Sequence, residues 1–363
     1  MLTFLRWLGR ALFVLFVLVL LACCLEAIKF ERWKERKLAD LDKGSTIVQT
    51  SAGPIEYAES GKGPAVLICH GAPGGYDQAL LLGESLAKEG FRVIAPSRPG
   101  FLRTPLTSGM LFDEQADALA GLLDKLGIQT TSVVGFSTGA QVAARFAIRH
   151  PDRTTALVLI SPVTKQYACD PKTQSPLLAE AALSGATGDM GSWLFVEQAK
   201  RDPRWMLNAV LAVDTMLKSA ERGKIVDYVL SHPEQLEFFR GLIGTQAPLS
   251  PRETGTRNDL LLVRALDPVS YERILSPILI VKGDADAGGA WVDPGVITEK
   301  AHSAQTLLVK GAGHLVWFGP GADAAQQAIL NFLAHPPAMP TPPPSPAPMP
   351  VAPPAPSATP SAQ

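Results

Sequence analysis

The sequence has few charged residues and no excess of either sign. Only 18 % of its 363 residues are charged, and 33 basic side chains stand against 34 acidic ones, which gives a formal net charge of -1. Proteins that bind nucleic acid normally carry a basic excess, because phosphates must be neutralised. The charge balance therefore argues against a nucleic-acid partner and favours a neutral or apolar small molecule.

Cysteine is also scarce. Of the four cysteines, Cys23 and Cys24 lie in an apolar N-terminal run, so only Cys69 and Cys169 remain for the folded body. Two isolated thiols form neither a zinc site nor a disulfide framework, and we expect no metal or other cofactor. Free cysteine is often buried, and Cys69 is expected to lie within a buried strand.

The longest uncharged apolar run covers residues 11–25. As a helix it spans roughly 22 Å, less than a hydrocarbon core of about 30 Å. Flanking apolar residues lengthen it if Arg6 and Arg10 reach the interface, so an uncleaved membrane anchor is the favoured interpretation. A secretory signal with Ala22 before its cleavage site, or a lipoprotein signal with Cys23 as the lipidated residue, stays open.

Membrane association is therefore expected, but the side of the membrane is not determined. Basic residues follow the apolar run at positions 29, 32, 34, 36 and 37, which favours a cytoplasmic body under the positive-inside rule. Glu31 and Glu35 interrupt this basic segment and make the excess small. At the other end, residues 336–363 consist mainly of Pro, Ala and Ser, which predicts an unstructured polyproline-II tail that could be a spacer or a ligand for a protein partner.

Between Ser45 and Ala334, segments typical of strands alternate with segments typical of helices, and the chain is 47 % hydrophobic, which excludes wholesale disorder. This alternation predicts an α/β protein with a mostly parallel, doubly wound sheet. Strands are expected at 46–50, 55–59, 65–69, 92–95, 132–135, 156–160, 277–282 and 306–309, and helices at 80–88, 114–126, 140–148 and 324–333.

The interval 161–276 lacks strand-like runs. Helical stretches are expected there at 177–183, 193–200, 205–213, 224–230 and 234–243, and an insertion of this length is better explained by a helical cap than by a loop. The expected organisation is an N-terminal anchor or signal and basic linker (1–44), a core (45–161), a cap (162–276), a second core part (277–335) and a disordered tail (336–363).

Gly135-Phe136-Ser137-Thr138-Gly139 has the pattern G-x-S-x-G and lies directly between a buried strand and a helix. In that context the serine occupies a tight turn above the sheet, and the following helix N-terminus favours developing negative charge. Small residues at Gly135 and Gly139 let the helix approach the strand. Ser137 is therefore the candidate nucleophile.

A serine nucleophile needs a base, and the base needs a carboxylate. His314 follows the last strand in a glycine-rich loop and is the best placed of six histidines. Asp286 is the favoured acid, with Asp284 as a rival and Asp293 as a weaker one. The loop that follows residues 156–160 offers no acid.

The attacked carbonyl oxygen also needs N–H donors. We expect these to be the backbone N–H groups of Thr138 and of Ala72, which follows His70-Gly71 after the strand 65–69. His70 itself is expected to brace its loop by hydrogen bonding rather than to act in catalysis.

The segments 70–74 (His-Gly-x-Pro-Gly) and 97–101 (Ser-Arg-Pro-Gly-Phe), the Ser137 turn, Asp286 and His314 together resemble the capped α/β-hydrolase superfamily over residues 46–334. The resemblance implies a serine hydrolase of the esterase type acting on a small, apolar ester-like substrate through an acyl-enzyme. Proline iminopeptidases usually have G-G-S-W-G at the elbow, and carbon–carbon bond hydrolases often have Trp after the histidine, where this chain has Leu315. Both stay as alternatives, with an acyltransferase and a non-catalytic binding member.

Overall fold

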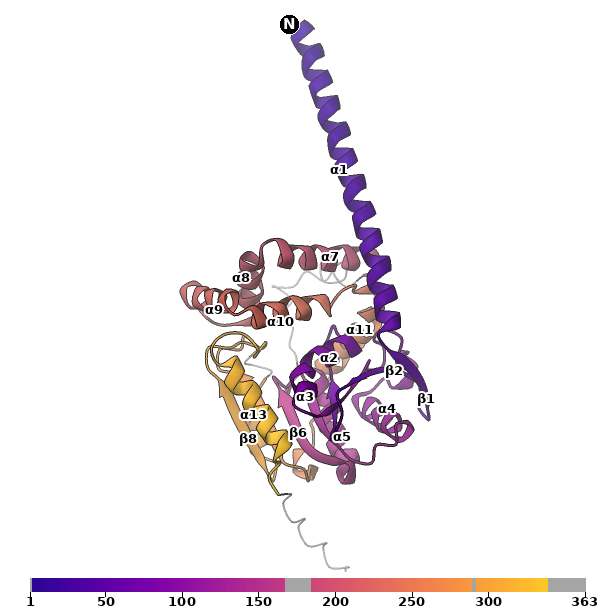
Figure 1. Cartoon of the computed structure of the whole chain (residues 1–363), viewed down its shortest axis with the longest axis vertical. Coiled ribbons are helices and arrows are strands. Elements are labelled where there is room, and N and C mark those ends of the chain that lie inside the picture. Colours follow the sequence, from indigo (N-terminus) through magenta and orange to yellow (C-terminus); the bar gives the residue numbers. More distant parts are fainter. Residues whose placement is uncertain (1, 167–183, 289–291, 339–363) are drawn as a thin grey trace, which may run out of the picture.

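The computed structural model describes residues 2–166, 184–288 and 292–338 (Figure 1). Its centre is an eight-stranded sheet in the order β1-β2-β4-β3-β5-β6-β7-β8. The pairs β1/β2 and β2/β4 are antiparallel and all other neighbouring strands are parallel, which confirms the expected α/β class. The strands are β1 (Thr46–Thr50), β2 (Gly53–Ser60), β3 (Ala65–Cys69), β4 (Arg92–Pro96), β5 (Thr131–Phe136), β6 (Thr154–Ile160), β7 (Ile278–Gly283) and β8 (Ala304–Val309).

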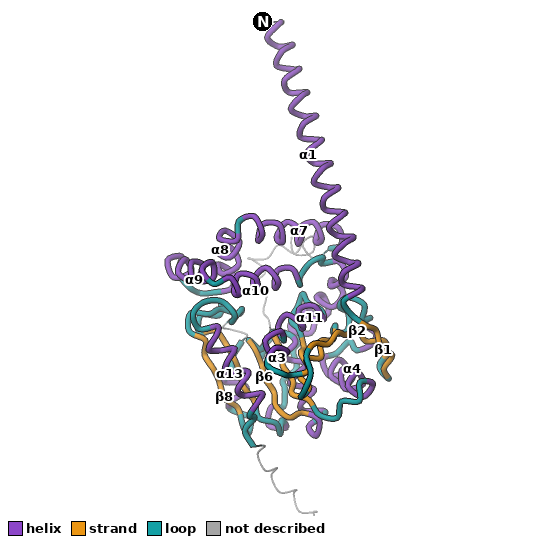
Figure 2. Tube along the Cα trace, viewed as in Figure 1, coloured by secondary structure: helices purple, strands orange, loops and turns teal. Residues whose placement is uncertain are grey.

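Both faces of the sheet are buried because the central strands are apolar on both sides. In β3, Leu67 and Cys69 face one core while Val66 and Ile68 face the other, as alternation along a strand requires. Helices flank the strands in two layers (Figure 2). One layer holds α4 (Phe112–Lys125), α5 (Gly139–Arg149) and α12 (Gly295–Thr298), and the other holds α2 (Tyr76–Leu82), α3 (Glu84–Lys88) and α13 (Ala322–Ala334).

The chain between β6 and β7 forms a group of helices, which lie at one end of the sheet (Figure 1). They are α7 (Gly185–Arg201), α8 (Pro203–Asp214), α9 (Ser219–Ser231), α10 (Pro233–Gly244) and α11 (Glu253–Arg264). The first four share an apolar cluster of their own, built around Leu207, Val226 and Phe239. We call these five helices the helical insert.

Two local expectations differ from the structure. The helix expected over 80–88 is divided at Gly83, where a Cβ would lie 2.6 Å from Ile68 Cδ1 and prevent the close packing on the sheet. The helix α11 was not expected. Its buried residues include Gly255, Thr256 and Asp259, so its buried side does not show the helical repeat of apolar residues from which a helix is predicted. The expected helix at 177–183 and residues 339–363 of the expected tail lie outside the described residues.

The N-terminal segment forms one helix, α1 (Leu2–Lys43), which includes both the apolar run and the basic residues after it. Its second half packs on the body and buries Phe30 and Leu41. The ammonium of Lys34 lies 2.7 Å from a carboxylate oxygen of the buried Asp189 in α7. The apolar first half projects away from the body (Figure 1). By length and composition this helix could cross a membrane, and a signal sequence near the N-terminus would have the same properties.

Candidate active site

Ser137 stands at the turn between β5 and α5. Its φ of 54° lies in the left-handed region, which residues other than glycine seldom adopt. The flanking glycines allow the tight turn, since a Cβ on Gly135 would lie 2.6 Å from Ala140 Cα and one on Gly139 would lie 2.2 Å from the Cys69 carbonyl oxygen. This geometry leaves Ser137 partly exposed at the end of an otherwise buried strand.

The structure brings His314 and Asp286 to this serine. His314 Nε2 lies 3.0 Å from Ser137 Oγ, and His314 Nδ1 lies 3.3 Å from Asp286 Oδ2. Asp286 is buried, and its Oδ1 accepts the Gly288 N–H at 2.7 Å. A base is therefore within reach of the serine proton, and a carboxylate lies against the other ring nitrogen of the base.

The two rival acids have other partners. Asp284 is exposed, and its Oδ1 accepts the Gly311 N–H at 2.7 Å. Asp293 forms an ion pair with Lys165 at 2.7 Å, and that pairing holds the pKa of Asp293 below its usual value. The loop after β7 thus turns Asp286, rather than Asp284, toward His314.

Ser161, directly after β6, supports the position of His314. Its hydroxyl donates to the His314 carbonyl oxygen at 2.7 Å, and its backbone N–H donates to Val281 O at 2.8 Å. The residue is fully buried and has a φ of 44°. From the sequence, the loop after residues 156–160 is notable only because it contains no acid. No motif indicates that Ser161 contacts the loop that carries His314.

The two expected N–H donors flank the same serine turn. Thr138 follows Ser137 at the start of α5, and Ala72 lies in the loop after β3. A Cβ on the neighbouring Gly71 would lie 3.4 Å from Ser137 Cβ, so this loop passes close to the serine. Among the residues that the structure describes, no hydrogen bond uses the backbone N–H of Ala72 or Thr138.

His70 is fully buried and is occupied on both ring nitrogens. Its Nδ1 lies 2.7 Å from Gly71 O, and its Nε2 accepts the Arg98 N–H at 3.0 Å. Burial, together with the nearby Arg98 guanidinium, lowers the pKa of His70 well below its usual value. A neutral imidazole that braces the loop agrees with the sequence expectation.

A buried ion pair connects the loop after β3 with the serine turn. Arg98 and Asp259 are both almost fully buried and pair through two hydrogen bonds. Arg98 Nε also donates to His70 O at 2.9 Å, while Thr138 Oγ1 donates to Asp259 Oδ2 at 2.7 Å. No motif in the sequence links Asp259, on the unexpected helix α11, with this network.

A second carboxylate that the sequence did not indicate lies beside His314. Asp214 ends α8, and its two oxygens lie 3.2 and 3.4 Å from the Leu315 nitrogen, whose N–H they accept. Burial raises the pKa of Asp214 to about 6, with the nearby Asp286 carboxylate acting in the same direction. His314 and the Leu315 N–H offset only part of that increase.

The residues that follow Asp214 continue this contact. Thr215 forms an isolated antiparallel bridge with Asp286, and the Met216 N–H donates to Ala285 O at 2.8 Å. The Asp214 carbonyl oxygen accepts the Ala287 N–H at 3.1 Å. Residues 214–216, at the end of α8 and just after it, therefore contact both the loop after β7 that carries Asp286 (the acid loop) and the loop after β8 that carries His314 (the histidine loop).

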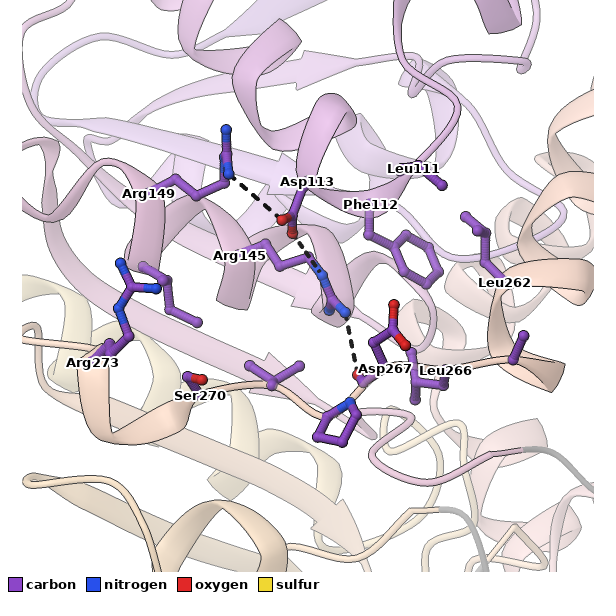
Figure 3. Close-up of a pocket in the computed structure, with 14 residues that line it drawn as sticks. Leu111, Phe112, Asp113, Arg145, Arg149, Leu262, Leu266, Asp267, Ser270 and Arg273 are labelled. Carbon is purple, nitrogen blue, oxygen red and sulfur yellow. Dashed lines mark hydrogen bonds and ion pairs between the residues drawn. The ribbon is translucent and has the colours of Figure 1, made fainter.

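Two pockets lie away from Ser137. One, of about 270 Å³, is lined by Arg145 and Arg149 near the far end of α5, about 15 Å along that helix from the serine turn (Figure 3). Asp113 pairs with both arginines, so they are already compensated. The other pocket, of about 420 Å³, lies between α2, α10 and α13.

Within the described ranges, no three His, Cys, Asp or Glu side chains gather as a metal site would require.

Comparison with known proteins gives matches over most of the chain. The family model described as alpha/beta hydrolase fold matches residues 64–319. The uncharacterized hydrolase YcgS of Bacillus subtilis (strain 168) is 27 % identical over 283 residues, which cover 77 % of this chain and 95 % of YcgS. The 2-hydroxy-6-oxo-6-phenylhexa-2,4-dienoate hydrolase of Comamonas testosteroni is 35 % identical over 215 residues, which cover 56 % of this chain and 69 % of that enzyme.

A solved structure shows the same architecture. The alpha/beta hydrolase fold protein from Nakamurella multipartita superposes with a TM-score of 0.71 and 29 % sequence identity. The match covers 80 % of this chain and 98 % of that protein.

Proposed function

Because this chain belongs to the alpha/beta hydrolase fold family and is a hydrolase, we propose that it cleaves a carboxylic ester or related acyl bond through an acyl-enzyme on Ser137. The single observation that carries the proposal is the continuous contact from Ser137 Oγ through the His314 ring to Asp286. Such a contact activates a hydroxyl that is otherwise a poor nucleophile.

In the proposed mechanism, His314 Nε2 takes the hydroxyl proton while Ser137 Oγ attacks the carbonyl carbon of the substrate. Asp286 stabilises the imidazolium and fixes the ring orientation. The imidazolium then gives its proton to the leaving alcohol as the carbon–oxygen ester bond breaks. A water molecule, deprotonated by His314, attacks the acyl-enzyme, and the carboxylic acid leaves as Ser137 recovers its proton.

The oxyanion is assigned to the backbone N–H groups of Ala72 and Thr138. Each such donor contributes about 10²–10³ in rate when it is placed in advance. The ion pair of Arg98 and Asp259 supports this placement, because it holds the His70 carbonyl and the Thr138 hydroxyl in one buried network.

We further propose that residues 162–276 form a cap over this site, with residues 45–161 and 277–335 as the core. The separate apolar cluster of α7–α10 and the contact of residues 214–216 with the acid and histidine loops support this division. Phe136 packs against the His314 ring at 5.5 Å between centroids, and such an apolar neighbour suits an apolar acyl group.

The first half of α1 is proposed to be a membrane anchor that stays attached to the body. Its second half supports this assignment, because Phe30 and Leu41 are buried against the body and the helix continues unbroken into the exposed apolar run.

Labelling with a fluorophosphonate tests the nucleophile. We expect the wild-type protein to be labelled and to hydrolyse short-chain esters, and Ser137→Ala to lose both properties. Ser132→Ala, within β5 ahead of the Ser137 turn and hydrogen-bonded to Thr155 at 2.8 Å, is the matched control and should retain both. A folded wild-type protein that is never labelled would contradict the proposal.

Cleavage of a carbon–carbon bond is the second candidate, because the Comamonas testosteroni relative is named for hydrolysis of a 2-hydroxy-6-oxo-dienoate. Leu315, rather than Trp, follows His314 here, which favours the ester. Parallel assays of a 2-hydroxy-6-oxo-dienoate and of esters with acyl chains of increasing length separate the two candidates.

A further inference from the structure

Helix α7 packs against α1 close to the point where the apolar run of α1 begins to project from the body. Phe30 packs against Trp193 of α7, with 5.7 Å between ring centroids, and Lys34 pairs with Asp189 of the same helix. The apolar run ends at Leu25, only about 7.5 Å along the helix from Phe30. A headgroup region is about 5–8 Å thick on each side of the hydrocarbon core. If α1 crosses a bilayer, α7 therefore lies at headgroup depth.

The outward side of α7 and α8 is unusually apolar for a surface. Leu194 and Phe195 of α7 are 54 % and 57 % exposed, and Trp205, near the start of α8, is 57 % exposed. We call these three residues the α7–α8 face. Outside α1, the part of the chain that the structure describes exposes ten large hydrophobic side chains, and this face supplies three of them from a stretch of 12 residues.

Figure 1 shows α7 and α8 along the edge of the body from which α1 projects. Since Asp189 and Trp193 of α7 contact α1, the α7–α8 face belongs to helices that lie next to the point where α1 leaves the body. Exposed apolar groups gathered in this way indicate an interaction surface, and Trp and Phe are typical of membrane interfaces.

The charges around this face indicate the kind of lipid that it contacts. Lys200 pairs with Glu197 at 2.9 Å, and Arg204 pairs with Asp227 at 2.7 Å. These two basic side chains are already compensated within the protein, so they add little attraction between this face and anionic headgroups. The contact of the α7–α8 face should then depend on apolar burial and should form with zwitterionic lipids.

We propose that the α7–α8 face lies in the headgroup region of the same bilayer that α1 enters, so that the helical insert rests on the membrane surface. This inference rests on the proposed anchor. It commits to lipid, and not a second copy of the chain, as the occupant, because the helix that enters the lipid is packed directly on α7.

Photo-crosslinking in the full-length protein tests the inference. Single p-benzoylphenylalanine substitutions are made at Phe195 and Trp205 of the face, at Phe13 in the apolar run and at Leu308 on β8. Leu308 is the matched control, because it is apolar and 59 % exposed, and because Figure 1 shows its strand β8 well away from α1. Each variant is reconstituted in phosphatidylcholine vesicles and irradiated, and lipid adducts are measured by mass spectrometry.

Lipid adducts at positions 13, 195 and 205, but not at 308, would support the inference. Adducts at 13 with only control levels at 195 and 205 would overturn it while leaving the anchor intact. Protein–protein adducts at 195 or 205 would instead assign the face to a second copy of the chain. Absence of adducts at 13 would remove the anchor and the inference together, whereas ester hydrolysis in the same vesicles tests the proposed reaction separately.

Discussion

Replacing Asp214 with asparagine should stabilise the protein at pH 8 and have little effect at pH 4. Burial raises the pKa of Asp214 from an ordinary value of 3.8 to about 6. An acid whose pKa is higher in the folded state favours folding while it is protonated, and that contribution is lost as the pH rises through the folded value. An increase of this size corresponds to about 3 kcal/mol of lost stability above pH 6.

Asparagine keeps an oxygen that accepts the Leu315 N–H but carries no charge that must be desolvated. Asp214→Asn should therefore raise the free energy of unfolding by about 3 kcal/mol at pH 8 and by about 0.5 kcal/mol at pH 4. For a domain of this size, the larger value amounts to an increase of roughly 5 °C in the melting temperature. Thermal unfolding in mild detergent at both pH values measures the difference, and Asp152→Asn, at an exposed position, is the control.

The same substitution should change the pH dependence of catalysis. The Asp214 carboxylate attracts the His314 imidazolium, so its removal should move the acidic limb of the kcat profile to lower pH. Equal or lower stability of Asp214→Asn at pH 8, together with an unmoved acidic limb, would refute the assignment of Asp214 as a destabilising buried charge beside the base.

Other substitutions test the remaining contacts. Asp286→Asn should lower kcat for an ester about 10⁴-fold, whereas Asp284→Asn should stay close to wild type; the reverse order would exchange their roles. Gly139→Ala should cost about 1–3 kcal/mol of stability in denaturant unfolding, because its Cβ would meet the β3 carbonyl, and an unchanged midpoint would contradict that packing. Asp259→Ala should cost about 3–5 kcal/mol by leaving Arg98 buried without a counter-charge, and a double change of both residues to apolar ones should recover part of the loss.

The sequence predicted the parts of the fold and site that depend on local patterns. Apolar strands separated by amphipathic helices identified the parallel sheet, and Ser137, Asp286 and His314 each stand in a recognisable turn after a strand. The structure brings these three residues together, and their catalytic roles stay a prediction. The division of the expected helix at Gly83 could not be predicted in this way, because it depends on the distance from α2 to the sheet and not on the residues next to Gly83.

Other parts of the site could not be predicted, because they depend on contacts between distant segments. Asp214 and Asp259 come from the helical insert and carry no motif. Asp259 also lies on a helix whose buried side is polar, so the apolar period that would reveal the helix is missing. The function of Ser161 is equally hidden, since a hydroxyl that holds a backbone carbonyl of the histidine loop has no signature in its own neighbourhood.

The contact of residues 214–216 with the acid and histidine loops limits how this enzyme can be recombined with its relatives. The bridge from Thr215 to Asp286 and the hydrogen bond from Met216 to Ala285 make the insert part of the scaffold that holds Asp286 beside His314. A chimaera that receives the insert of another hydrolase would lose these contacts, and the positions of Asp286 and His314 would have to be restored by compensating substitutions in both loops. We therefore expect that sequence changes in the insert are accompanied by matching changes in the two loops.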